Sequence, residues 1–182
     1  MTLKEKIFSQ LNQSLKEGEK LTTSVLRMLS AAIVNKEKEK RYKLTKAEPG
    51  LTEKEIVKKS QLGDEEIIEI ISSEIKKRKE ASSEFEKGKR MDLAEKEKKE
   101  IEILKKYLPE QLSEEEIKRL VKEAIAKTSA TEPKDMGKVM QELMPKVKGK
   151  AEGGKLSKIV KELLTRAAAK GEEEDLSSLT TP

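Results

Sequence analysis

The sequence predicts an all-α protein. Of its 182 residues, 41% are charged and 34% are apolar, and the apolar residues recur at the three- and four-residue spacing of a helix face. Two Tyr, two Phe and no Trp provide little of the aromatic content that strands favour. We therefore expect an N-terminal four-helix bundle followed by a small three-helix domain, each with a thin core.

Four amphipathic segments predict the N-terminal bundle, which we assign to residues 1–109. They cover residues 2–17, 22–41, 64–87 and 91–107, and Pro109 ends the last of them. Between the second and third segments, residues 43–63 contain a Pro-Gly break and a Thr-x-x-Glu capping signal. We expect these residues to form a loop insertion that includes a short helical piece.

The second domain is predicted over residues 110–166. A capping box at Ser113 and Glu116 opens its first helix, and the apolar rows of the three helices fall within residues 117–125, 136–143 and 156–164. Residues 133–166 are basic, with nine Lys or Arg against four Asp or Glu. The remaining residues, 167–182, hold one Lys against four acids and little apolar material, so we expect a disordered acidic tail.

The composition excludes several classes of chemistry. The absence of Cys rules out disulfides and thiolate metal sites, and the absence of His removes the usual general base at neutral pH. No apolar run approaches the roughly 20 residues of a membrane helix. We expect a cytoplasmic binding protein with no cofactor, no metal and no membrane span, rather than an enzyme.

The most distinctive stretch is "KGKAEGGKLS", residues 148–157. It follows the first part of the nucleotide-binding pattern G-x-x-x-x-G-K-[ST], but Leu156 replaces the required hydroxyl, and a helix ending near Pro145 precedes it instead of a strand. Two interpretations stay open: an anion site at the start of the next helix, or a solvated basic turn. The cluster "KKRK" at 76–79 is likewise either a solvated face or a nucleic-acid contact.

Three stretches together resemble the GatB/YqeY family. They are "SVLRMLSAAI" at 24–33, "YLPEQLSEEEI" at 107–117 and "KDMGKVMQELMPKVKGKAEGGKLSKIVKELL" at 134–164. The resemblance extends from Leu3 to Leu164. It implies a helical bundle followed by a three-helix domain similar to the tail of the B subunit of glutamine-dependent aminoacyl-tRNA amidotransferases. In those enzymes the tail contacts tRNA, whereas other domains transfer the amide.

The resemblance implies a tRNA-binding or amidotransferase-associated accessory protein that is not catalytic by itself. Two alternatives stay open: an adaptor that docks on an amidotransferase or an aminoacyl-tRNA synthetase, and a carbon–nitrogen ligase with glutamine as amide-nitrogen donor. The candidates for contact with RNA phosphates, all within the last stretch, are Lys134, Lys138, Lys146, Lys148, Lys150 and Lys155, with Gly149 and Gly154 at its turns.

The sequence departs from the family pattern at three places. Glu152 stands where the family commonly has a short capping Asp, which is expected to loosen the start of the last helix. Lys150 stands where Arg is common, which keeps the charge but loses bidentate phosphate geometry. Residues 43–63 are an addition relative to the shorter family members.

Overall fold

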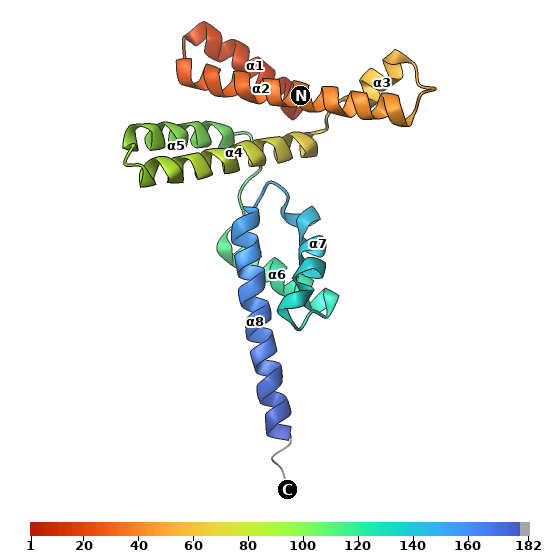
Figure 1. Ribbon diagram of the computed structural model, residues 1–182, viewed down its shortest axis with the longest axis vertical. Helices are drawn as coiled ribbons and strands as arrows, with labels where there is room; N and C mark the ends of the chain where they lie inside the picture. Colours follow the sequence, from red (N-terminus) through yellow and green to blue (C-terminus); the bar gives the residue numbers. More distant parts are fainter. Residues whose placement is uncertain (179–182) are drawn as a thin grey trace. The chain divides into compact units, whose positions relative to one another are not determined.

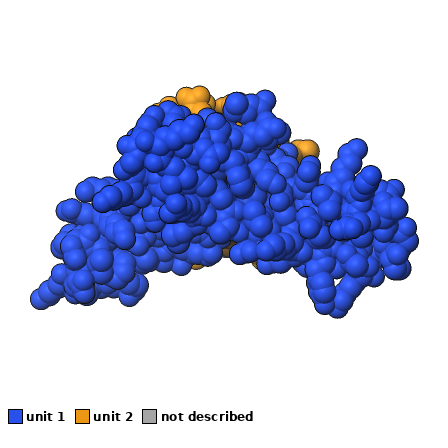
Figure 2. Space-filling model, turned by 90° about the horizontal axis from the view of Figure 1, so that it is seen from above, with its two compact units in different colours: residues 1–109 blue, residues 110–182 orange. Residues whose placement is uncertain are grey.

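The chain forms two compact units, Met1–Pro109 and Glu110–Pro182, which Figure 2 draws in separate colours. The computed structural model describes the backbone of residues 1–178 and the side chains of residues 1–166. Within these residues all regular structure is helical, with eight α-helices, one short 3-10 helix and no strand. This confirms the all-α prediction. No helix of the described residues is long and apolar enough to cross a membrane.

The first unit consists of two helical hairpins and one short helix. Its elements are α1 (Leu3–Glu17), α2 (Lys20–Ala47), α3 (Glu53–Ser60), α4 (Asp64–Lys87) and α5 (Met91–Lys105). Helix α1 packs against α2, α4 packs against α5, and α2 contacts both members of the second hairpin (Figure 1). The core lies between the hairpins, where Leu29 and Ile33 of α2 are buried together with Ile71 of α4 and Leu104 of α5.

Five helices form the first unit where the sequence predicts four, and the difference lies in residues 43–63. The first five of these residues belong to α2, because nothing interrupts the helix before Pro49, and Pro disfavours helical geometry in the residue before it. The expected short helical piece is α3. It starts at the capping box, in which the Thr52 hydroxyl accepts from the Glu55 amide at 3.4 Å while the Glu55 carboxylate accepts from the Thr52 amide at 2.9 Å.

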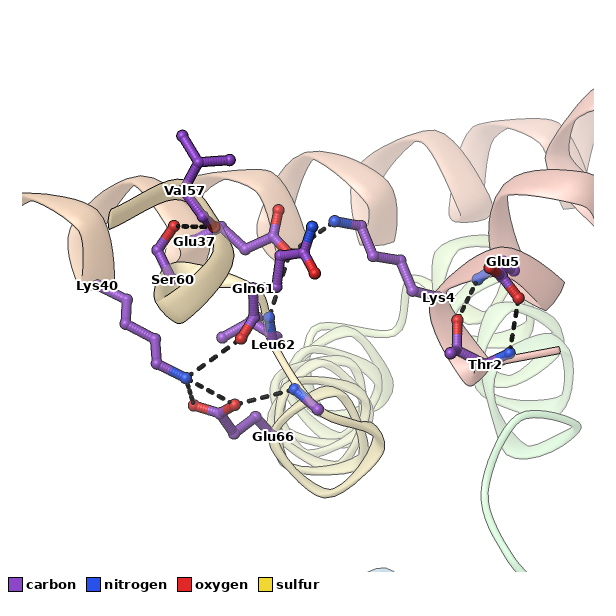
Figure 3. A network of polar contacts seen from close by, with 11 residues as sticks. Thr2, Lys4, Glu5, Glu37, Lys40, Val57, Ser60, Gln61, Leu62 and Glu66 are labelled. Atoms are coloured by element: carbon purple, nitrogen blue, oxygen red, sulfur yellow. Dashed lines mark hydrogen bonds and ion pairs between the residues drawn. The ribbon is translucent and has the colours of Figure 1, made fainter. Parts of the chain in front are cut away.

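Two charged residues of α2 hold the chain between α3 and α4 in place (Figure 3). The Glu37 carboxylate accepts from the Leu62 amide at 3.2 Å and from Lys4 Nζ at 2.6 Å. Lys40 Nζ donates to the Glu66 carboxylate at 2.8 Å and to the Gln61 carbonyl at 3.3 Å. These bonds fix the end of α3 against the middle of α2.

The second unit contains α6 (Glu114–Thr128), the 3-10 helix η1 (Pro133–Asp135), α7 (Met136–Val147) and α8 (Gly153–Ser178). Its core is aliphatic, and its fully buried members include Val121, Val139, Leu143, Val160 and Leu164. The segment 167–182, for which the sequence predicts a disordered tail, starts where the described side chains end. The backbone of α8 continues through Ser178, and residues 179–182 lie outside the described part of the chain.

Candidate nucleic-acid interface

The lysine-rich turn links α7 to α8. Helix α7 ends at Val147, two residues beyond the expected end near Pro145, and includes Pro145 in its last turn. Burial of the Val147 side chain, which is 2% exposed, holds that turn in the core. Gly149 then adopts a left-handed φ of 72°, which glycine tolerates without strain, and the Lys150 amide donates to the Val147 carbonyl at 2.9 Å.

The chain just before α6 clamps this turn. Gln111 Nε2 donates to the Gly149 carbonyl at 2.6 Å, and the Leu112 amide donates to the Lys150 carbonyl at 2.8 Å. The Leu112 side chain packs against the core of the second unit. Two of the stretches that carry the family resemblance, 107–117 and 134–164, are therefore in direct contact, and the turn is held at both carbonyls.

An ion pair ties the start of α8 to the start of α6. Glu114 accepts from Lys118 Nζ at 2.7 Å and from Lys155 Nζ at 3.3 Å. Hydrogen bonds from Lys118 and Lys155 lower the pKa of Glu114 below its ordinary value. The positive charge of Lys155 is thus shared with a carboxylate instead of standing free.

The structure divides the six predicted lysines into two groups. Lys134 lies in η1 and pairs with Glu132 at 2.6 Å, and Lys138 lies in the first turn of α7 and pairs with Asp135 at 2.8 Å. The other four lie at or beyond the C-terminal end of α7. Lys138 and Lys146 are eight residues apart, which corresponds to about 12 Å along the helix. This second group consists of Lys146, Lys148, Lys150 and Lys155. Lys146 Nζ lies 3.6 Å from the Glu142 carboxylate, Lys148 is half-buried, and Lys155 is ion-paired.

Lys150 differs from the other five predicted lysines. Its side chain is exposed and forms no hydrogen bond or ion pair with the described residues, while its backbone is bonded at both the amide and the carbonyl. A flexible cation is therefore presented on a fixed turn. Gly154 lies in the first turn of α8, and the space beside its Cα is open.

Two further lysines on α8, which were not among the predicted residues, are candidates for contact with phosphates. Lys158 and Lys161 are exposed and have no ion-pair partner within the described residues. They project from the side of α8 opposite to its buried row, which includes Leu156 and Val160. The sequence pattern does indicate them, because Lys158 and Lys161 alternate with the apolar residues of a basic helix. Residues between the apolar positions of an amphipathic helix face away from the core.

The "KKRK" cluster is not a free basic patch. Arg78 is only 6% exposed, and it donates from Nε to the Glu100 carboxylate at 3.0 Å and from Nη1 to the Glu74 carboxylate at 2.7 Å. Lys77 pairs with the same Glu74 at 2.8 Å. Most of the charge of this cluster is therefore balanced inside the first unit. Among the described residues, no group of three or more acidic side chains is arranged to hold a metal ion.

The fold and the basic turn define a two-unit helical protein whose second unit has an excess of positive charge in residues 133–166, with nine Lys or Arg against four Asp or Glu. Residues 37–164 match the model of a family described as Yqey-like protein, which is more than half of the chain, so the protein belongs to the YqeY-like family. The match contains the stretches at 107–117 and 134–164, and it begins after the stretch at 24–33.

One relative is an uncharacterized protein of Schizosaccharomyces pombe. It is 44% identical to this chain over 50 residues, which is 28% of this chain and 41% of the relative. The aligned segment therefore spans less than half the length of that relative.

Proposed function

We propose that this protein is a cytoplasmic tRNA-binding accessory factor, associated with amidotransferase systems and without catalytic activity of its own. The observation that carries the proposal is the clamped turn, which presents the exposed, unpaired Lys150 just before α8, the helix that bears the unpaired Lys158 and Lys161. Lys146 and Lys148 precede the turn in the sequence, and Lys155 lies in the first turn of α8. The sequence resemblance to the tRNA-contacting tail of an amidotransferase subunit also supports the proposal, and its stretches at 107–117 and 134–164 lie within the residues that match the family model.

Unpaired lysines suit the RNA backbone better than paired ones. An ammonium group that already contacts a carboxylate must exchange that partner for a phosphate, whereas Lys150, Lys158 and Lys161 need only displace water and counterions. We therefore assign the dominant phosphate contacts to these three residues. Lys134 and Lys138 are proposed to contribute less, since each has an acidic partner within 3 Å.

A salt-dependent binding titration tests the proposal. The variant Lys150→Glu/Lys158→Glu/Lys161→Glu should bind tRNA at least tenfold more weakly than the wild type at low salt. Loss of three phosphate contacts should also make the dependence of log K on log salt less steep by roughly 2 to 3.

The matched control must carry the same change in net charge on another surface. Lys16, Lys96 and Lys99 of the first unit are suitable, because all three are exposed and have no ion pair with the described residues. Equal tRNA affinity of the Lys150 triple variant and a Lys16→Glu/Lys96→Glu/Lys99→Glu variant would contradict the assigned surface. Absence of tRNA binding by the wild type at low salt would refute the function itself.

A surface groove favours the adaptor function as a second candidate. Residues at the α1–α2 turn line this groove, among them the exposed Leu15, Lys20, Arg27 and Met28. Within residues 21–35 only Arg27 is charged, although 41% of the whole chain is charged. A groove of this kind, where the exposed Leu15 and Met28 lie beside only two cations, fits a protein partner better than RNA.

The two functions can be separated by treatment with RNase. Binding to a purified amidotransferase or synthetase that survives RNase and is lost on Met28→Glu would favour the adaptor. Binding that RNase abolishes would favour the tRNA factor.

A further inference from the structure

The first unit has a basic arm, which we define as residues 36–60, comprising the C-terminal part of α2 and all of α3. It holds nine Lys or Arg against five Asp or Glu. Helix α3 packs on α2 and on no other described helix, and Figure 1 shows both segments extending beyond α1 and α4. The arm therefore exposes most of its surface.

The carboxylates of the arm are largely occupied, and most of its cations are not. Glu37 pairs with Lys4, Glu39 with Lys36 and Glu48 with Lys59, while Glu55 caps α3. Six cations of the arm are exposed and have no ion pair with the described residues: Lys38, Arg41, Lys43, Lys46, Lys54 and Lys58. The arm thus differs from the "KKRK" cluster, where the charge is balanced.

The arm also carries the one strongly exposed aromatic side chain among the described residues. Tyr42 is 63% exposed, whereas Tyr107 is 7% exposed and both Phe side chains are partly buried. Lys46 Nζ lies 4.5 Å from the centre of the Tyr42 ring. An exposed ring contributes little to the core, and its position among cations makes it available to a ligand that offers both a flat ring and negative charge.

The geometry of α2 aligns the ring with the charges. Lys38, Tyr42 and Lys46 are spaced four residues apart and form one stripe, with about 6 Å of helix rise between neighbours. The opposite side of the helix bears Glu37, which anchors the end of α3 (Figure 3). The stripe is therefore held on a helix whose inner face is already bonded.

We propose that this stripe, together with Arg41, binds single-stranded RNA. An unpaired base stacks on the Tyr42 ring, and Lys38, Arg41 and Lys46 neutralise the phosphates on either side. An aromatic ring interleaved with cations is the combination that single-stranded nucleic acids require. A lipid surface is a poorer fit, because the same face of α2 carries no large aliphatic side chain. The inference is independent of the proposed function, since the two surfaces share no residue.

Fluorescence anisotropy with a labelled single-stranded RNA tests the inference. The RNA should have about 12 nucleotides, which is within the site sizes of single-strand-binding proteins. Tyr42→Ala should weaken binding by roughly 5- to 150-fold, the range expected for loss of one stacked base. Tyr42→Phe should bind like the wild type, because the ring is kept. Lys38→Glu/Arg41→Glu/Lys46→Glu should make the salt dependence less steep by about 2.

Two controls keep the result specific. The Lys16→Glu/Lys96→Glu/Lys99→Glu variant has the same net charge as the arm variant and should retain single-strand binding. The Lys150→Glu/Lys158→Glu/Lys161→Glu variant should lose affinity for tRNA but should still bind the single-stranded oligonucleotide. Far-UV circular dichroism checks that the variants, all changed at exposed positions, remain helical.

The inference is overturned if Tyr42→Ala binds the oligonucleotide as tightly as the wild type. It is also overturned if the arm variant and the Lys16 control lose affinity equally. In either case the tRNA result with the Lys150 variant stands by itself, so failure of the arm site and failure of the proposed function remain distinguishable.

Discussion

The buried Arg78 offers the sharpest test of how the first unit is held together. Its guanidinium joins three helices: it bonds to Glu74 of its own helix α4 and to Glu100 of α5, and Nη2 lies 3.8 Å from the Met28 sulfur of α2. We predict that Arg78→Met destabilises the unit strongly. Methionine is close in length, so the main loss is the charge and its hydrogen bonds.

The expected loss is about 3–5 kcal/mol, the usual cost of removing one partner of a buried ion pair. The reason is that the Glu100 carboxylate, whose side chain is only 9% exposed, loses the buried cation that donates to it. Lys77→Met removes a cation from the same Glu74, but Lys77 is 68% exposed, so this control should lose less than about 1 kcal/mol. Adding Glu100→Leu to the Arg78→Met variant should restore most of the lost stability, because it removes the buried carboxylate that has lost its partner.

Urea unfolding followed by circular dichroism, at pH 7 and at acid pH, measures these differences. Burial raises the pKa of Glu74, but hydrogen bonds from Lys77 and Arg78 outweigh this effect and leave the pKa below its ordinary value. The stability that Glu74 contributes is therefore full above the ordinary carboxyl pKa and is lost as the pH falls through the lowered value. This acid-sensitive part should be smaller in Arg78→Met. Equal losses for Arg78→Met and Lys77→Met at pH 7 would refute the reasoning.

Three further predictions concern the second unit, and urea unfolding curves measure each. Gly149→Ala should lower the free energy of unfolding by about 1–2 kcal/mol, because the backbone φ of this residue is 72°. Gly154→Ala should raise the free energy of unfolding by about 0.4–1 kcal/mol, because the space beside this residue of α8 is open. Equal effects of the two substitutions would contradict the turn geometry. Ser113→Ala should cost about 1 kcal/mol, because the hydroxyl accepts from the Glu116 amide, and no loss would mean that the capping box is dispensable. Leu143→Ala should cost about 2–5 kcal/mol, because the side chain is fully buried, and a loss below 1 kcal/mol would place it outside the core.

The all-α class and the helix starts could be predicted from the sequence because they depend on local patterns. The capping boxes at Thr2, Thr52 and Ser113 are all formed in the structure, since their partners lie three residues away. The end of α7, predicted near Pro145, falls two residues later at Val147, because Pro145 is tolerated in a last turn that burial of Val147 stabilises. That burial depends on contacts with other helices, which the local sequence does not contain.

The sequence by itself determined the family, the helical periodicity and the position of the basic turn. Only the tertiary structure decided which charged side chains are exposed and have no ion-pair partner among the described residues. The Arg78–Glu100 pair joins residues 22 positions apart, and the bond from Gln111 to Gly149 joins residues 38 positions apart. Since a cation is neutralised by whichever carboxylate the fold brings within reach, composition cannot separate Arg78, which is buried and paired, from Lys150, which is exposed and unpaired.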